Sequence, residues 1–344
     1  MRRDMKRILI VGAGAIGGTL AVHLGKICDL FVLEKDPALR EIIAARGITL
    51  KDGLESRTVQ PTVLSSPAEI PKGVEFCFLC TRAYHLGTAA GEVFPYLHHD
   101  ALLVSMNNGI CLEPFAEAVG ELRAVCASIR FGVGAEEPGV YKLKIRGGLI
   151  LGMKDGYCPP RLNELANLID PVIPCRVTDN ILGELYSKML INACMTSAAV
   201  LSGQTLGEIL ASREGRMLFD QILFEGVKVA EAEGVKIPPY DGKLRYGLLA
   251  GHNPVSAAAR KLTYDALAKK YADRTSSTLD ALLRGVPTET DFYNGSLSQT
   301  GRRLGVPTPV NDRVCRLIAQ IEQDPELISP INLGIAVGLD INQH

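Results

Sequence analysis

Residues 7–27, RILIVGAGAIGGTLAVHLGKI, decide the fold of the first half of the chain. The opening apolar run is short and ends in glycines, which is typical of a buried parallel strand. The part from Ala15 to Ile27 predicts a helix, and residues 29–36, DLFVLEKD, predict a second strand. A strand, a glycine-rich turn, a helix and another strand in this order indicate a parallel, doubly wound sheet with right-handed crossovers.

The glycines of the turn follow the spacing G-x-G-x-x-G, with Gly12, Gly14 and Gly17 at the three fixed positions. The first permits a tight turn, the second lets a pyrophosphate approach the backbone, and the third lets helix and strand pack closely. The positive end of the following helix favours phosphate. We therefore expect a dinucleotide site that also includes Ala15 and Ile16. The alternative is a glycine-rich turn that binds no ligand.

An acid and a base follow each other at the end of the second predicted strand. Glu34 comes about 20 residues after Gly12, where an acid accepts hydrogen bonds from the adenosine ribose and repels a 2′-phosphate. Lys35 would neutralise that repulsion or pair with a 2′-phosphate. These residues favour NADH over NADPH as the cofactor. The alternative is that both are solvated residues at a strand end.

Three more strands are expected in the first half, and two of them end in polar residues. The apolar runs lie at residues 75–81, 101–109 and 124–129. In a doubly wound sheet, ligands bind at the carboxyl ends of the strands. Arg82 and Asn108 are therefore candidates for contacts with the nicotinamide or the substrate. Turn chemistry explains the Asn-Asn-Gly sequence around Asn108 equally well.

From about residue 180 the apolar residues recur at helical spacing, and the strand patterns disappear. Helices are expected at residues 181–195, 215–234, 277–285, 290–305 and 311–323. Residues 171–180, PVIPCRVTDN, contain two prolines and are expected to form the linker. The chain is thus predicted to hold a Rossmann-type dinucleotide-binding domain at 1–178 and an all-α substrate and catalytic domain at 179–344, with a cleft between them.

The first helix of the second half carries a polar stripe in an apolar run. Asn192 and Thr196 follow Lys188 at spacings of four and eight residues, so the three side chains share one face of the helix. An unpaired ammonium in a core is costly, and we expect Lys188 to face a polar cleft, a carboxylate or a ligand. The alternative is a lysine that extends its ammonium to water.

The composition excludes several classes of function. Lys and Arg number 37 against 38 Asp and Glu, so no net field attracts nucleic acid or an anionic membrane. No segment supplies the roughly 20 apolar residues of a membrane span, and Asp4 interrupts the basic start that imitates a signal peptide. Cys77 and Cys80 lack a second pair that would complete a zinc site. A cytoplasmic protein that binds a small molecule and no metal is expected.

Several motifs in order resemble the ketopantoate reductases, the 2-dehydropantoate 2-reductases of coenzyme A (pantothenate) biosynthesis. They are GAGAIGG, CTRAYH, NNGI, ELYSKMLINACMT, and SSTLDALLRGVPTETDFYNG followed by LGVPTPVNDRV. The resemblance covers essentially the whole chain. It implies a Rossmann-type domain, a helical domain shared with the 6-phosphogluconate dehydrogenase superfamily, and reduction of a small 2-oxo acid by NADPH.

The resemblance also implies roles for individual residues. Lys188 matches the catalytic lysine and general acid of the family, and Glu289 matches the glutamate that binds the substrate hydroxyl. Asn192 matches an asparagine on the substrate face of the same helix. Ser277 matches the serine that holds the substrate carboxylate, and Asn108 matches the asparagine of the N-G loop.

Four positions depart from the family pattern. Arg82 stands where a lysine near the cofactor is usual, and Thr196 replaces a second asparagine on the catalytic helix. Arg274 replaces an asparagine three residues before Ser277 and would add a bidentate clamp on the substrate. Glu34 precedes Lys35 where the family often presents a basic residue to the NADP phosphate.

Together these observations predict NAD(P)H-dependent reduction of ketopantoate to pantoate, with a lean towards NADH and a possible homodimer. One alternative is a related reductase or dehydrogenase of another small 2-oxo or hydroxy acid, which Thr196 and Arg274 motivate. The other is a non-catalytic protein that senses nucleotides, because the fold alone does not establish activity.

Overall fold

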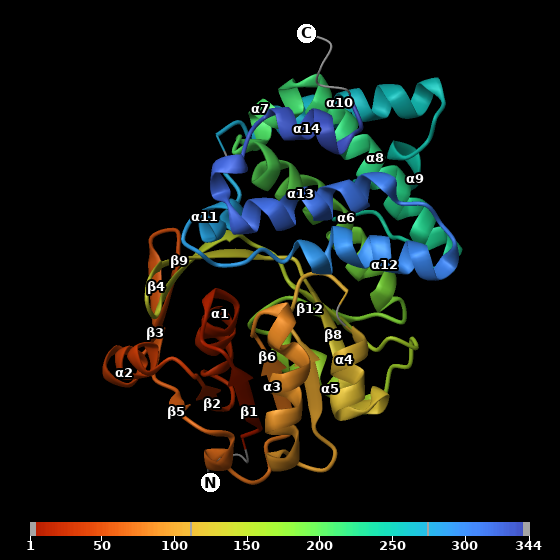
Figure 1. Cartoon of the computed structure of the whole chain (residues 1–344). Coiled ribbons are helices and arrows are strands. Elements are labelled where there is room, and N and C mark those ends of the chain that lie inside the picture. Colours follow the sequence, from red (N-terminus) through yellow and green to blue (C-terminus); the bar gives the residue numbers. More distant parts are fainter. Residues whose placement is uncertain (1–4, 111, 274, 340–344) are drawn as a thin grey trace. The chain divides into compact units, whose positions relative to one another are not determined.

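A computed structural model describes residues 5–110, 112–273 and 275–339. The chain divides between Ile181 and Leu182 into two compact units, each with its own core. The first unit is α/β and the second is all-α, which confirms the predicted fold class (Figure 1).

An eight-stranded sheet forms the centre of the first unit, in the order β12-β11-β8-β7-β6-β1-β2-β5. The strands from β8 to β5 are parallel, whereas β11 pairs with β8 in the antiparallel sense. The chain leaves β1 towards β2 and later returns to β6 on the other side, so the winding reverses at β1. The strands are β1 Arg7–Val11, β2 Asp29–Leu33, β5 Thr62–Leu64, β6 Phe76–Leu79, β7 Leu102–Ser105, β8 Ala124–Ile129, β11 Leu149–Gly152 and β12 Cys175–Val177.

Helices cover this sheet and complete a continuous apolar core (Figure 1). The central strands β6, β7 and β8 are buried along their whole length, as strands of a parallel sheet covered on both faces are. The helices are α1 Ala15–Leu24, α2 Pro37–Arg46, α3 Leu86–Val93, α4 Leu112–Val119 and α5 Pro160–Ile169, with 3₁₀ turns at Pro67–Glu69 (η1), Ala83–His85 (η2), Phe94–Tyr96 (η3) and Glu121–Arg123 (η4).

A second, four-stranded sheet of order β4-β3-β10-β9 packs beside α1 (Figure 1). The sequence did not predict it, because the only apolar runs that were expected to be strands belong to the large sheet. Its central pair joins distant segments in parallel, with Val140 opposite Thr49. The strands are β3 Ile48–Asp52, β4 Glu55–Val59, β9 Gly132–Glu137 and β10 Val140–Ile145.

The interpretation of residues 171–180 as a linker was wrong. Within this segment Cys175–Val177 forms β12, the edge strand of the large sheet, with Cys175 opposite Leu149. An edge strand needs partners on one side only, which makes prolines beside it tolerable. The prolines that suggested a linker, Pro171 and Pro174, therefore precede a strand of the first unit.

The second unit consists of helices, and α8 approaches α6 closely at Gly226. A Cβ on Gly226 would lie 2.2 Å from Cδ2 of Leu190, a residue of α6, so the glycine allows the two longest helices to touch. The elements are α6 Ile181–Ser202, α7 Leu206–Ala211, α8 Arg213–Ala232, α9 Tyr246–Leu249, α10 Pro254–Lys270, α11 Ser277–Leu282, η5 Thr290–Phe292, α12 Asn294–Leu304, α13 Pro309–Gln323, η6 Pro325–Leu327 and α14 Ile331–Ala336.

A chain of buried hydrogen bonds connects four of these helices. Ser197 of α6 donates to Asn294 Oδ1 at 2.6 Å, and Asn294 donates to Asn311 Oδ1 at 2.8 Å. Asn311 in turn donates through Nδ2 to Oε2 of Glu225, a residue of α8, at 2.7 Å. None of these four residues is more than 4% exposed. Because buried polar groups need partners, the chain fixes α6, α8, α12 and α13 in one arrangement.

Glu225 also caps the amino end of α13. Its carboxylate accepts from the backbone N–H groups of Val310 at 2.8 Å and Asn311 at 3.0 Å, two amides of the first turn, which have no intrahelical acceptor. Burial raises the pKa of Glu225, although the hydrogen bonds that it accepts from Asn311 and Val310 oppose this rise. A carboxylate of another helix thus takes the place of a local N-cap.

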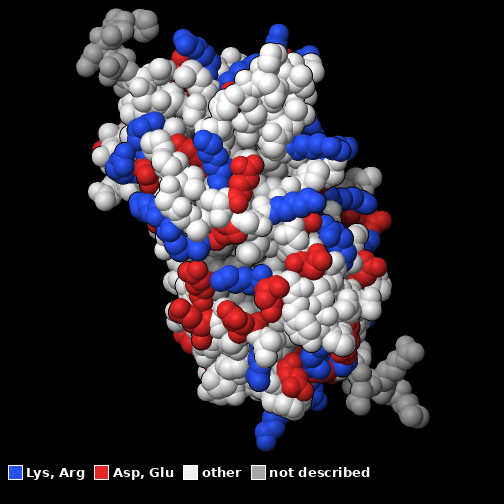
Figure 2. Space-filling view, turned by 90° about the vertical axis from the view of Figure 1, so that its right-hand side faces the viewer, with Lys and Arg blue, Asp and Glu red and all other residues white. Residues whose placement is uncertain are grey.

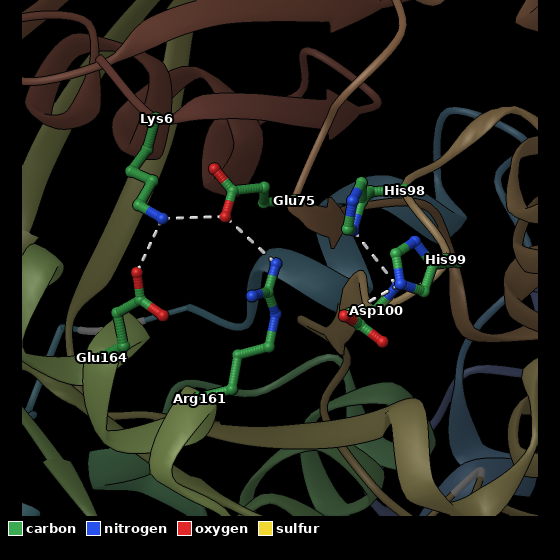
Figure 3. A network of polar contacts seen from close by, with 7 residues as sticks. All are labelled: Lys6, Glu75, His98, His99, Asp100, Arg161 and Glu164. Carbon is green, nitrogen blue, oxygen red and sulfur yellow. Dashed lines mark hydrogen bonds and ion pairs between the residues drawn. The ribbon is translucent and has the colours of Figure 1, made fainter. Parts of the chain in front are cut away.

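Ion pairs join the starts of the parallel strands β1 and β6 to α5 (Figure 3). The glycine turn follows the other end of β1. Lys6 Nζ lies 2.8 Å from Glu75 Oε2 and 2.7 Å from Glu164 Oε1, and Arg161 lies 3.1 Å from Glu75 Oε2. The ammonium of Lys6 lowers the pKa of Glu75 against the effect of burial. Figure 3 also shows His98, His99 and Asp100 on the neighbouring loop.

None of the helices among the described residues is long and apolar enough to cross a membrane. Positive and negative side chains lie next to one another on the face drawn in Figure 2, in keeping with the balanced charge of the sequence.

Replacing Glu225 by alanine should lower the free energy of unfolding by about 2–5 kcal/mol, because several buried donors lose their acceptor at once. Urea unfolding followed by circular dichroism measures the change. Glu231→Ala on the exposed side of the same helix is the control and should change the midpoint little. Equal midpoints for both variants would contradict the structural role of Glu225.

Candidate functional site

The turn between β1 and α1 has the geometry that its glycines predicted. Gly12 has φ +92°, a backbone conformation that favours glycine. A Cβ on Gly17 would lie 1.9 Å from the carbonyl oxygen of Gly12, so only glycine permits this approach of helix and turn. In contrast, among the described residues only Gly14 itself and its chain neighbours lie within 4 Å of the position of a Gly14 Cβ. The turn therefore packs closely against the helix at Gly17, whereas Gly14 borders open space.

The amino end of α1 is available to an anion. Gly14 is the N-cap and forms no side-chain cap, and no acidic residue lies in the first turn. Ala15 and Ile16 follow it and are half-buried. The first amides of a helix lack intrahelical acceptors and carry the positive end of the helix dipole. This end thus combines open space with donors, as a pyrophosphate requires.

Glu34 is fixed at the end of β2 by two backbone amides. Its Oε2 accepts from Ala13 N at 2.7 Å, and its Oε1 accepts from Asp36 N at 3.0 Å. Each carboxylate oxygen can accept a further hydrogen bond. The carboxylate is therefore oriented beside the glycine turn and retains acceptor capacity for the hydroxyls of a ribose.

Lys35, the basic residue that follows Glu34, forms an ion pair with another residue of the first unit. Lys35 Nζ lies 2.8 Å from Oε2 of Glu92, a residue of α3, although 68% of the lysine side chain is exposed. Arg40 donates to the backbone carbonyls of Glu34 at 2.9 Å and Lys35 at 2.7 Å. Two basic side chains thus lie near the strand end, and each has a partner within the protein.

The loops after β6 and β7 contain two buried oxygens without a hydrogen-bond partner in the described residues, Oγ1 of Thr81 and Oδ1 of Asn108. Asn107 is different, because its amide donates to the carbonyl of Thr81 at 2.7 Å and joins the two loops. Arg82 is exposed and precedes η2. Asn107 therefore holds the turn, whereas Thr81 and Asn108 keep acceptors at the carboxyl ends of the strands, where ligands bind.

The polar stripe of α6 lies on an accessible face of a helix that is mostly buried elsewhere. Lys188, Asn192 and Thr196 are each half-buried, whereas neighbouring Met189 and Ala193 are fully buried. The spacing of four residues thus corresponds to one face, as expected. On this face a mostly buried helix presents an ammonium, an amide and a hydroxyl in a row.

The segment that carries Glu289 is tied to this helix. Glu289 is half-buried and immediately precedes η5, and Asn294, the first residue of α12, accepts the hydrogen bond from Ser197 of α6. The sequence singled out Glu289 but not this connection. The Asn294-Gly295 pair was visible in the sequence, but nothing local shows that its amide is buried.

Ser276 and Ser277 have different environments. Ser276 is the N-cap of α11 and accepts from Thr278 N at 3.2 Å. Ser277 begins the helix and is exposed. The prediction for Arg274 concerns a position outside the described residues.

The residues of the first unit fit a nicotinamide dinucleotide. The open position at Gly14 and the uncapped end of α1 suit the pyrophosphate, and the carboxylate of Glu34 suits the ribose. The unpartnered oxygens of Thr81 and Asn108 provide acceptors for the polar groups of the nicotinamide end.

Two family models match the chain in order. Residues 8–156 match the model described as ketopantoate reductase PanE/ApbA, and residues 180–322 match the model of its C-terminal part. The 2-dehydropantoate 2-reductase of Mesorhizobium japonicum is 25% identical over 340 residues, which cover 92% of this chain and 97% of the relative.

Solved structures have the same fold over almost their whole length. The crystal structure of 2-dehydropantoate 2-reductase from Methylococcus capsulatus is 26% identical, with a TM-score of 0.75 and coverage of 92% of this chain and 97% of the other. A structure of D-mandelate dehydrogenase with NADH and anilino(oxo)acetate is 20% identical, with a TM-score of 0.78 and coverage of 93% and 99%. With both halves matched in order, the chain belongs to the ketopantoate reductase family and is an oxidoreductase that acts between a 2-oxo group and the corresponding alcohol.

Proposed function

We propose that the protein reduces ketopantoate to pantoate, with cofactor binding in residues 1–178 and substrate chemistry in residues 179–344. The observation that carries the proposal is the half-buried stripe of Lys188, Asn192 and Thr196 on a helix that is mostly buried elsewhere. It occurs in a member of the ketopantoate reductase family, within the part of the chain that matches the C-terminal model of that family.

Lys188 serves as the general acid. A bound nicotinamide supplies the hydride for the 2-oxo carbon. As negative charge develops on the carbonyl oxygen, the ammonium of Lys188 stabilises that oxygen and donates the proton that completes the alcohol. A half-buried lysine suits this role because it reaches a substrate while most of the surrounding helix excludes water.

The other polar residues bind and orient the substrate. Asn192 hydrogen-bonds the substrate on the same helix face, Glu289 holds the hydroxyl, and Ser277 holds the carboxylate. Arg274 adds a bidentate cation for that carboxylate. The bond from Ser197 to Asn294 supports this assignment, because it ties the segment after Glu289 to the helix that carries the lysine.

NADH is the preferred cofactor. The Glu34 carboxylate, held by the amides of Ala13 and Asp36, accepts from the ribose hydroxyls and repels a 2′-phosphate. The ion pair between Lys35 and Glu92 supports this choice, since a paired lysine offers less charge to a phosphate. Asn108 and Arg82 contact the nicotinamide end. The D-mandelate dehydrogenase of the same fold was solved with NADH.

A related reductase of a bulkier 2-oxo acid is the second candidate. Thr196 stands where the family presents an asparagine, and it is half-buried on the stripe beside Asn192. The fold that this chain shares with a D-mandelate dehydrogenase supports the possibility of a different side chain on the substrate. A larger acid would fill the room that the shorter threonine leaves.

Replacing Lys188 by alanine should lower kcat for ketopantoate reduction by about 10²–10⁴-fold, because the proton donor and the positive charge are both lost. The dissociation constant of the cofactor, measured by fluorescence titration, should change little. Lys261→Ala, at an exposed position of α10, is the matched control. Turnover of the Lys188 variant within twofold of that control would refute the assignment.

Replacing Glu34 by serine should weaken NADH binding about tenfold and narrow or reverse the preference over NADPH, because the ribose loses a charged acceptor and the 2′-phosphate loses a repulsive neighbour. Calorimetric titration with both cofactors measures the change. Glu41→Ser on the exposed face of α2 controls for the loss of a surface charge. Tighter binding of NADPH than of NADH by the unmutated protein would mean that Lys35 dominates.

A further inference from the structure

Both backbone polar groups of Ala13, the central residue of the glycine turn, are held by side chains. Its N–H donates to Glu34 Oε2 at 2.7 Å, and its carbonyl oxygen accepts a hydrogen bond from the hydroxyl of Tyr141. Tyr141 lies 128 residues further along the chain, on β10 of the small sheet. A strand outside the dinucleotide-binding sheet thus reaches into the turn.

The ring of Tyr141 is fixed by close packing against α1. Tyr141 is 2% exposed, and a Cβ on Gly18 would lie 2.0 Å from its Cε2 atom. Burial, together with the charge of Glu34, raises the pKa of Tyr141 to about 12. The hydroxyl therefore remains a protonated donor throughout the neutral pH range.

The direction of the Ala13 carbonyl determines where the next amide points. A trans peptide is planar, so its C=O and its N–H point in opposite directions. When Tyr141 holds the carbonyl of Ala13, the N–H of Gly14 is aimed away from Tyr141. Gly14 is exposed and has open space around its Cα. An amide at this position is directed towards the open space that a pyrophosphate would occupy beside the second glycine of the motif.

We propose that Tyr141 is a positioning residue for the cofactor, which holds the glycine turn in its binding conformation before the dinucleotide arrives. The proposal rests on the proposed function in one respect, namely that the turn binds the pyrophosphate of a nicotinamide dinucleotide. A glycine-rich turn has much backbone freedom, and fixing it in advance removes an entropic cost from binding.

Glu34 and Tyr141 act on the same residue from opposite sides. Glu34 holds the peptide before Ala13, and Tyr141 holds the peptide after it. Residues that share a partner couple in double-mutant cycles. The two side chains should therefore be energetically coupled in dinucleotide binding, although they come from different sheets.

Tyr141→Phe removes the hydroxyl and keeps the ring against Gly18, so the loss is one hydrogen bond. The dissociation constant of ADP-ribose, measured by calorimetry, should rise about fivefold. Adenosine lacks the pyrophosphate, and its affinity should change less. In steady-state assays the KM for NADH should rise more than kcat falls. Tyr96→Phe, at an exposed tyrosine of η3 in the same unit, is the matched control.

Two further variants separate positioning from general destabilisation. In Gly18→Ala the added methyl group displaces the ring of Tyr141, although the tyrosine keeps its hydroxyl. The affinity for ADP-ribose should be lower in this variant as well. In the double variant Tyr141→Phe/Glu34→Ser, the fold-change in the Kd for ADP-ribose should differ from the product of the fold-changes in the two single variants.

Unchanged affinity of Tyr141→Phe for ADP-ribose, equal losses for ADP-ribose and adenosine, or strict additivity with Glu34→Ser would each overturn the role of Tyr141. If the unmutated protein bound no ADP-ribose, the dinucleotide site itself would be refuted, and this inference with it. The results that would overturn only the role of Tyr141 are compatible with binding of the proposed cofactor. Failure of this inference can therefore be distinguished from failure of the proposed function.

Discussion

The two hydrogen bonds to Ala13 are the interaction on which the first unit depends. One anchors the turn to the end of β2 through Glu34, and the other anchors it to the small sheet through Tyr141. They add to the hydrogen bond from Gly12 N–H to the carbonyl of Leu33 at 2.8 Å, which ties the start of the turn to β2. With them, the strand end, the helix start and the small sheet are joined around the position that we propose for the pyrophosphate.

In the second unit, a buried chain of hydrogen-bonded side chains likewise holds separate elements together. The bonds from Ser197 through Asn294 and Asn311 to Glu225 connect α6, α12, α13 and α8. Such a chain is costly unless every member has a partner, and it therefore allows few alternative arrangements of the helices. The consequence for function is that the helix that carries Lys188 is held in register with the segment that follows Glu289.

Local patterns predicted the parts that depend on neighbours in sequence. The strand, turn and helix around Gly12 follow from apolar periodicity and glycine spacing, and the stripe that begins at Lys188 follows from the helical repeat. The small sheet could not be predicted in this way, because its central strands pair residues as distant as Thr49 and Val140. Tyr141 was missed for the same reason, since its partner is a backbone carbonyl far away in the sequence.

The family identifies an oxidoreductase that acts on a 2-oxo group. The proposal of NADH as its cofactor rests on the residues around Glu34. The most direct measurement is the initial rate of NADH and NADPH oxidation by the unmutated protein, with ketopantoate and a set of bulkier 2-oxo acids. We predict that ketopantoate supports saturable oxidation of the cofactor. At low cofactor concentration the rate should be higher with NADH than with NADPH. Binding of NADH without turnover of any 2-oxo acid would contradict it.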